Sequence, residues 1–296
     1  MPVLRLLQFI MNHPVNRQHK VRSLIRFAKW QISSRLASGA TVYEWINGSR
    51  LIVRNGDTGL TGNIYTGLHE FADMAYLLHV LRREDCFVDV GANLGSYTVL
   101  AGSVVGARGF AIEPVPTTFA RLLDNIRLNN LSDRVVAINF GVAHEAGTMK
   151  FTSDLDTVNH VIAAGEGSSN TIEVNVTTLD DVIGSSGSNL IKIDVEGFET
   201  SVLEGAVRTL RSDSLHSVIM ELNGSGDRYG FDESRILSTM LDHGFKTFSY
   251  DPFARRLISL NGKNQRSGNT LFIRNESLVA ERLRSAPKFN VIGTII

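Results

Sequence analysis

The chain has 296 residues, of which 43% are hydrophobic and 20% charged, and its 30 basic residues balance its 30 acidic residues. This composition is typical of a globular protein and excludes disordered, collagen-like and coiled-coil chains. The zero net charge gives no overall attraction to nucleic acid, and the single cysteine, Cys86, excludes an internal disulfide and any metal site with several thiolates.

The basic residues are concentrated at the N-terminus, where residues 1–43 hold seven Lys or Arg side chains and no Asp or Glu. Residues 18–37 have helical periodicity. The apolar stripe of this helix is formed by Val21, Leu24, Ile25, Ala28, Ile32 and Leu36. The stripe fits either a helix docked on the main domain or a helix that contacts a membrane surface or another anionic partner.

An Asn-Gly pair at 47–48 predicts a hairpin between strands at 41–45 and 50–54. Residues 55–67 are rich in Gly, Asn and Thr, which predicts a loop. The apolar spacing over residues 70–83 predicts an amphipathic helix.

From residue 86 onward, strand-length apolar runs alternate with helical segments. This order predicts a doubly wound α/β sheet, largely parallel and covered on both faces. Residues 145–189 interrupt the alternation and predict an insertion over the end of the sheet. Two last strands are expected at 245–250 and 270–275, joined by a long polar loop. The earlier strands are expected at 86–90, 109–112, 134–140, 190–195 and 217–222, and the helices at 96–105, 117–129, 199–210 and 234–243.

The clearest motif runs from Phe87 to Tyr97: an apolar strand, Asp89, a loop with two glycines, and a helix. Such a loop lets backbone amides approach a ligand closely. Glu113 ends the next strand about 20 residues later, where a carboxylate typically accepts hydrogen bonds from ribose hydroxyls. Asn93 stands where a dinucleotide fingerprint has a glycine. The pattern therefore favours S-adenosylmethionine, which lacks the pyrophosphate.

With these motifs the sequence resembles the FkbM family of S-adenosylmethionine-dependent methyltransferases. The segments that carry the resemblance are 89–95, 113–114, 125–130, 178–181, 191–197 with Glu199, and 269–272. The resemblance implies a Rossmann-like, seven-stranded methyltransferase sheet whose last strand inserts antiparallel. It also implies O-methylation of a hydroxyl group on a sugar, a glycan or a polyketide-type natural product.

Carried over position by position, the resemblance implies a cofactor site at the ends of the first strands. Glu70 and the glycine loop would hold the methionine part, Glu113 the ribose, and Gly141 would lie near the adenine. The expected cofactor-binding residues are Glu70, Asp89, Gly91, Asn93, Gly95, Glu113 and Gly141.

A second constellation follows the fourth strand, where alternation places Lys192, Asp194 and Glu196 on one side. Glu221 ends the neighbouring strand and should lie beside Asp194. A hydroxyl acceptor must lose its proton, and Asp194 or Glu196 is the first candidate for the base or orienting group. His160, within the insertion, is the second.

The carboxylates at this edge are oxygen ligands suited to Mg²⁺, but they can also act alone, so no metal site is assigned. We expect an N-terminal extension at 1–68, a methyltransferase domain at 69–278 and a C-terminal tail at 279–296. The acceptor would be a small molecule or a glycan, and nucleic acid is not expected. The N-terminus lacks the features of a signal peptide, which fits a cytoplasmic protein. Two alternatives remain: an NAD-dependent oxidoreductase and a non-catalytic cofactor-binding or interaction module.

Overall fold

The computed structural model describes residues 3–36, 39–153, 159–163, 165–167 and 170–296. In these residues the central sheet has eight strands. In spatial order they are β12 (Arg256–Ser259), β11 (Lys246–Asp251), β13 (Asn269–Ile273), β10 (Ser217–Glu221), β9 (Leu190–Ile193), β3 (Cys86–Val90), β4 (Arg108–Ile112) and β5 (Val135–Ile138).

This sheet confirms the predicted Rossmann-like methyltransferase fold. Neighbouring strands from β5 to β10 run parallel, and β13 inserts antiparallel between β10 and β11. The eighth strand, β12, pairs with β11. It lies in the segment that was expected to be an irregular polar loop, and that detail of the prediction was wrong.

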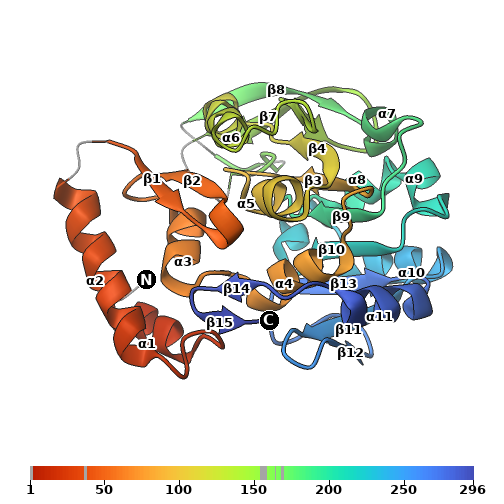
Figure 1. Cartoon of the computed structure of the whole chain (residues 1–296). Helices are drawn as coiled ribbons and strands as arrows, with labels where there is room; N and C mark the ends of the chain where they lie inside the picture. The colour runs from red at the N-terminus through yellow and green to blue at the C-terminus, as the bar shows by residue number, and fades with distance from the viewer. Residues whose placement is uncertain (1–2, 37–38, 154–158, 164, 168–169) are drawn as a thin grey trace.

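Helices cover both faces of the sheet (Figure 1). Successive residues of a strand point to opposite faces, and Phe87 and Val88 accordingly belong to different apolar clusters. One face is covered by α4 (Phe71–Val80), α5 (Ser96–Val99), its π-helical continuation (Leu100–Val105) and α6 (Pro116–Leu128). The other is covered by α7 (Leu179–Ile183), α8 (Glu199–Glu204), α9 (Val207–Arg211) and α10 (Glu233–Asp242).

The helix predicted over 199–210 is interrupted at Gly205. A Cβ at this position would lie 2.2 Å from the carbonyl oxygen of Ala143. The close approach of the two backbones therefore requires glycine at this position, which lies between α8 and α9.

The predicted insertion forms a second, three-stranded sheet in the order β6 (Gly141–Val142), β8 (Thr171–Thr177), β7 (Gly147–Thr152). It lies above the central sheet in Figure 1. Part of the expected lid, at 154–158, 164 and 168–169, falls outside the described residues.

The N-terminal region contains α1 (Val3–Asn12), α2 (Lys20–Leu36) and the predicted hairpin, β1 (Thr41–Glu44) with β2 (Arg50–Val53). The loop expected at 55–67 is wrong, because this segment contains α3 (Thr58–Thr66). Leu60 and Ile64, one turn apart, are buried in the main core. Packing thus overrides the weak helix propensity of the Gly- and Thr-rich sequence.

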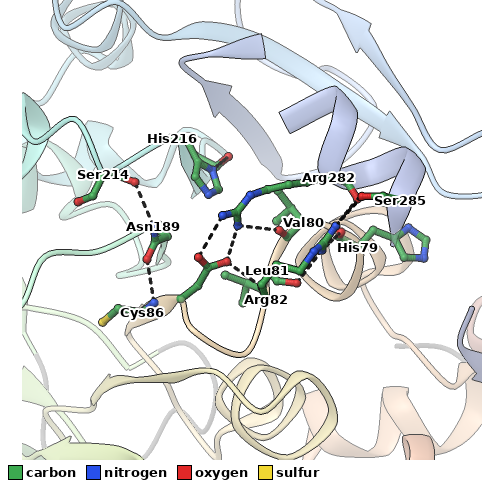
Figure 2. Close-up of polar contacts among 12 residues, drawn as sticks. His79, Val80, Leu81, Arg82, Cys86, Asn189, Ser214, His216, Arg282 and Ser285 are labelled. Carbon is green, nitrogen blue, oxygen red and sulfur yellow. Dashed lines mark hydrogen bonds and ion pairs between the residues drawn. The ribbon is translucent and has the colours of Figure 1, made fainter. Parts of the chain in front are cut away.

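The C-terminal segment forms α11 (Glu276–Ser285), β14 (Asn290–Val291) and β15 (Thr294–Ile295). Arg282 of α11 forms a two-pronged ion pair with the buried carboxylate of Asp85, at the start of the sheet (Figure 2). Arg82 donates to the carbonyl oxygen of Arg282 at 2.6 Å. These contacts fasten α11 to the turn between α4 and β3. Among the described residues, no helix combines the length and apolar character needed to span a membrane.

Candidate active site

A cavity of about 310 Å³ opens where the central strands end. Its lining comes from the carboxyl ends of β3, β4, β9 and β10, from α3 and α5, and from the three-stranded sheet. Ligands of open α/β sheets bind at this edge. The predicted site residues that line it are Glu70, Asp89, Gly91, Asn93, Glu113, Gly141, Asp194, Glu196 and Glu221. Gly95 and His160 are not among the described lining residues.

The loop after β3 is shaped by its backbone. Gly91 has φ +77°, and a Cβ there would lie 1.9 Å from the carbonyl oxygen of Asp194, so only glycine fits. Asn93 adopts a left-handed conformation, with φ 49°. Gly95 also has positive φ and starts α5, where a Cβ would meet Leu122 of α6. The two glycines therefore fix the loop, and Gly95 acts by packing rather than by facing the cavity.

Asp89 is almost fully buried and accepts a hydrogen bond from the hydroxyl of Thr98 at 2.6 Å. Strand register places it beside Lys192 of β9. Burial raises the pKa of Asp89, although the Lys192 charge and the Thr98 hydroxyl act against the rise. This carboxylate lies at the floor of the cavity, paired with a hydroxyl and close to a cation.

Glu113 connects the end of β4 to the glycine loop after β3. Its Oε2 accepts from the backbone N–H of Asn93 and its Oε1 from that of Val115, each at 3.0 Å. Each oxygen keeps a further lone pair for a ligand. Burial raises the pKa of Glu113 to about 7. The carboxylate is thus held in place by two N–H groups at the wall of the cavity.

The other end of the cavity is apolar. Phe140 and Gly141 line it together with Phe151 of β7 and Val142. At Gly141 a Cβ would approach Val176 to 2.9 Å and the Phe151 ring to 3.1 Å. Gly141 therefore allows the second sheet to pack closely against this wall.

Glu70 precedes α4, and its Oε1 accepts from Nδ2 of Asn269 at 2.7 Å. Asn269 also donates to Asp73 at 3.2 Å. Burial, then the Glu70 charge, raise the pKa of Asp73 to about 7. Glu70, which was expected to hold the methionine part, thus lines the cavity, and its charge acts on Lys192.

Lys192 is 4% exposed, and its Nζ lies 2.7 Å from Oδ2 of Asp194 and 4.9 Å from the centre of the Tyr97 ring. Burial alone would lower the pKa of Lys192, but the charges of Asp194, Glu70 and Asp89 raise it above its usual value. Lys192 is therefore a fixed cation beneath the carboxylates.

The three predicted carboxylates do come together: Asp194, Glu196 and Glu221 each offer an oxygen within 4.8 Å of the others. Burial, then Asp194, raise the pKa of Glu196 to about 7. Burial and the two neighbouring carboxylates raise the pKa of Glu221 well above its usual range. Such oxygens could hold Mg²⁺, but the ion pair with Lys192 already provides Asp194 with a cation.

The turn that carries Asp194 and Glu196 is held by Glu199, whose Oε1 accepts from the N–H groups of Val195 and Gly197 at 3.1 and 3.2 Å. Glu196 itself has φ +55°. This explains why Glu199 belongs to the motif although it does not line the cavity.

His160 lies differently from what was expected of a second base. Its Nε2 is 2.9 Å from Oε1 of Glu166, and its side chain is nearly buried. Its neighbours Asn159 and Val161 line the cavity instead. The described structure therefore pairs His160 with Glu166 beside the site.

Two asparagines support the site in ways that were not predicted from the sequence. Asn63 of α3 is fully buried, donates to Ser96 at 3.1 Å and lines the cavity. Asn125 of α6 donates to the carbonyl oxygen of Leu94 at 2.8 Å and accepts from the N–H of Ile52 at 2.7 Å. Asn63 lies in a segment that was expected to be a loop, so no local signal identified it. Asn125 belongs to segment 125–130, which carries the family resemblance, but its contacts with Leu94 and Ile52 were not predicted.

The polar groups of the cavity fit a polar ligand. Among the described residues, several buried side-chain atoms lack a hydrogen-bond partner, and three of these belong to lining residues: Nδ1 of His69, the hydroxyl of Tyr97 and Oε2 of Glu221. Buried polar atoms are normally satisfied. Together with the held carboxylate of Glu113, they suit a ligand that carries both hydroxyl and charged groups.

The comparisons with known proteins agree with this geometry. The family model of the methyltransferase FkbM domain matches residues 89–247, more than half of the chain. The chain belongs to the FkbM methyltransferase family. The predicted family is therefore confirmed, and the matched residues run from Asp89 through the carboxylate turn to β11.

Two relatives of the chain are named as methyltransferases. Hexuronic acid methyltransferase AglP of Haloferax volcanii is 31% identical over 159 residues, which cover 51% of this chain and 61% of AglP. Methyltransferase 1 of Beauveria bassiana is 28% identical over 182 residues, 53% of this chain and 72% of that protein. The chain thus spans about three fifths of the length of AglP.

Among solved structures, the FkbM methyltransferase from Methylobacillus flagellatus KT aligns with a TM-score of 0.44 and 20% identity, over 73% of this chain and 54% of that one.

Proposed function

We propose that this FkbM-family protein transfers a methyl group from S-adenosylmethionine to a hydroxyl group of a sugar, glycan or polyketide-type molecule. The proposal rests on one observation: a set of residues suited to a cofactor and a set suited to an acceptor line the same cavity. The held carboxylate of Glu113 and the glycine loop suit a nucleoside cofactor, and the cluster of Asp194, Glu196 and Glu221 suits an acceptor that must lose a proton.

Cofactor binding in this proposal uses residues along the whole cavity. Glu113 accepts hydrogen bonds from the ribose hydroxyls. Phe140, which is 37% exposed, and Gly141 flank the adenine. Asp89 and Glu70 face the ammonium group of the methionine part. The binding residues thus follow the order adenine, ribose, methionine from the second sheet towards α4.

When bound, S-adenosylmethionine supplies an electrophilic methyl carbon on a positively charged sulfur. The chain aligns the acceptor hydroxyl with that carbon, which is mainly a positioning task. Lys192 holds Asp194, and Asp194 orients the hydroxyl. The hydroxyl oxygen bonds to the methyl carbon, the carbon–sulfur bond breaks with its electron pair left on sulfur, and the hydroxyl proton passes to Glu196. A base with a pKa of about 7 is matched to neutral pH.

The acceptor itself has an apolar surface to rest on. Phe198 lines the cavity and packs against Tyr229 and Phe231, with ring centres 5.1 and 5.8 Å away. The Tyr229 hydroxyl donates to the carbonyl oxygen of Val161 at 2.7 Å, which fixes the cluster beside the carboxylates. The same three rings, with Val161, line a second hollow next to the first. We place the body of the acceptor there, on the aromatic rings.

The test is calorimetric titration of the purified chain with S-adenosylhomocysteine, with NAD as the comparison. We expect micromolar binding of S-adenosylhomocysteine and none of NAD. Transfer of a labelled methyl group to glycan and polyketide hydroxyls then identifies the acceptor class. Binding of NAD alone would favour an oxidoreductase. Binding of S-adenosylhomocysteine without transfer to any acceptor, and without any effect of Asp194→Asn in cells, would favour a non-catalytic module.

A further inference from the structure

Helix α2 is docked on the protein by the side opposite its apolar stripe, so of the two interpretations of the stripe, docking through it does not hold. Trp30 and Ser23 are buried, and the Phe27 ring packs 5.1 Å from that of Tyr65 in α3. Gln31 donates to the Tyr65 hydroxyl at 2.6 Å, and Arg26 donates to the Tyr65 carbonyl oxygen. The docked side is thus polar and aromatic, and it is firmly attached.

The apolar stripe faces away from the protein. Val21 is 71% exposed, Ile25 51%, Ile32 62% and Leu36 81%. At about 100° per residue these side chains share one face of the helix, opposite Trp30. In Figure 1, α2 forms the outer edge of the molecule, with α3 between it and the central sheet. A helix that turns its large apolar residues outward marks an interaction surface.

The charges around the stripe have a single sign. Arg22 and Lys29 border one side of it, Lys20 and Arg35 the other, and all four are exposed. The 17-residue helix contains no acidic residue. Two copies joined through this stripe by a twofold axis would bring like charges together, which is unfavourable. An anionic lipid surface instead accepts apolar side chains between basic ones.

We propose that α2 is an interfacial helix that holds this protein on an anionic membrane surface, with the Val21–Leu36 stripe among the lipid headgroups and the four basic residues on their phosphates. Because the opposite face is already fastened to Tyr65, binding needs no rearrangement of the fold. Through α3, which lines the active-site cavity, the membrane-facing helix also supports the wall of that cavity.

The experiment is flotation of the full chain with vesicles of phosphatidylcholine alone and of phosphatidylcholine mixed with phosphatidylglycerol. We expect the protein to float with the mixed vesicles, less so as salt is added, and not with the neutral ones. Ile25→Asn with Ile32→Asn should abolish flotation. The matched control, Val207→Asn with Leu241→Asn, removes two exposed apolar residues from other helices and should float like the unaltered chain.

The charges are tested separately with Arg22→Gln and Lys29→Gln. Removing two basic residues near an anionic surface should weaken vesicle binding roughly 25-fold, about fivefold for each charge. Arg108→Gln with Lys246→Gln is the control, since both are exposed and lie on strands. Circular dichroism checks that each variant is folded.

The proposal is wrong if the unaltered chain does not float with the mixed vesicles, or if the two stripe substitutions leave flotation unchanged. It is also wrong if the chain is a dimer in solution that the stripe substitutions convert to a monomer, because a second copy would then cover the helix.

Discussion

Glu113→Gln is expected to weaken S-adenosylhomocysteine binding while leaving the fold intact. In the structure both carboxylate oxygens accept a backbone N–H at 3.0 Å. A glutamine has one oxygen and one NH₂ group, so its NH₂ must face one of these two N–H donors. That geometry removes one hydrogen bond inside the protein and one of the two acceptors available to the ribose.

The magnitude follows from these contacts. Hydrogen bonds to a charged group contribute about 1.5–3 kcal/mol, and a buried donor left unpaired costs about 1–3 kcal/mol. Part of the cost of the unpaired donor is the same in the free and the bound protein and does not affect binding. We therefore expect the free energy of binding to be weaker by about 2–4 kcal/mol. This corresponds to a dissociation constant roughly 30- to 1,000-fold higher. The assay is calorimetric titration, with Glu173→Gln, an exposed acid on β8, as the matched control.

The pH dependence adds a second check. Burial raises the pKa of Glu113 to about 7 in the folded chain, so the carboxylate is ionised above that pH and neutral below it. Affinity of the unaltered chain should therefore fall as the pH drops below about 7, whereas that of Glu113→Gln should depend less steeply on pH, because only the other carboxylates of the cavity still titrate there. If Glu113→Gln bound S-adenosylhomocysteine as tightly as the unaltered chain above pH 7, the ribose assignment would be refuted.

Three further predictions concern the reaction and the fold. Asp194→Asn should abolish transfer of a labelled methyl group with little change in S-adenosylhomocysteine affinity, because Asp194 orients the acceptor and lies beside Lys192 rather than at the ribose. The transfer rate should rise with pH through about 7, where Glu196 ionises, and Glu196→Gln should remove that step; a rate independent of pH from 6 to 8 would argue against this base. Arg282→Met should lower the free energy of unfolding by about 3–5 kcal/mol, since it leaves the carboxylate of Asp85 buried and unpaired, and Asp85→Asn in the same chain should restore part of it.

The site residues that were predicted from the sequence lie in short, regular stretches of the chain. Asp89, Gly91 and Gly95 follow one strand directly, and Glu113 ends the next, so their positions depend on short stretches with a clear period. Strand register then places the end of β10 beside the end of β9, and Glu221 lies beside Asp194 as expected. The carboxyl ends of parallel strands meet at one edge whatever the rest of the chain does.

The parts that the sequence did not predict depend on partners far along the chain. Segment 55–67 has little helix propensity, and it is helical because Leu60 and Ile64 are buried in the main core. Which face of helix α2 docks was not decided by its apolar stripe, because the docked face is set by contacts with Tyr65, which lies 39 residues from Arg26. Asn125 shows the same limit, since its hydrogen-bond partner Ile52 is 73 residues away.

The charge of the cavity argues for the cofactor class independently of the motif. Its described lining carries six carboxylates and one buried amine, that of Lys192. Two like charges about 4 Å apart repel by about 4 kcal/mol at an effective dielectric constant of 20. Burial raises the pKa values of Glu113 and Glu196, and the neighbouring carboxylates raise them further. A dinucleotide would add the two negative charges of its pyrophosphate to this excess. S-Adenosylmethionine carries two positive groups, a sulfonium and an ammonium, and one negative group, its own carboxylate. Its net positive charge therefore relieves the repulsion among the carboxylates of the cavity. Binding should then lower the pKa values of these carboxyl groups and release protons near pH 7, which calorimetry in buffers of different ionisation enthalpy measures directly.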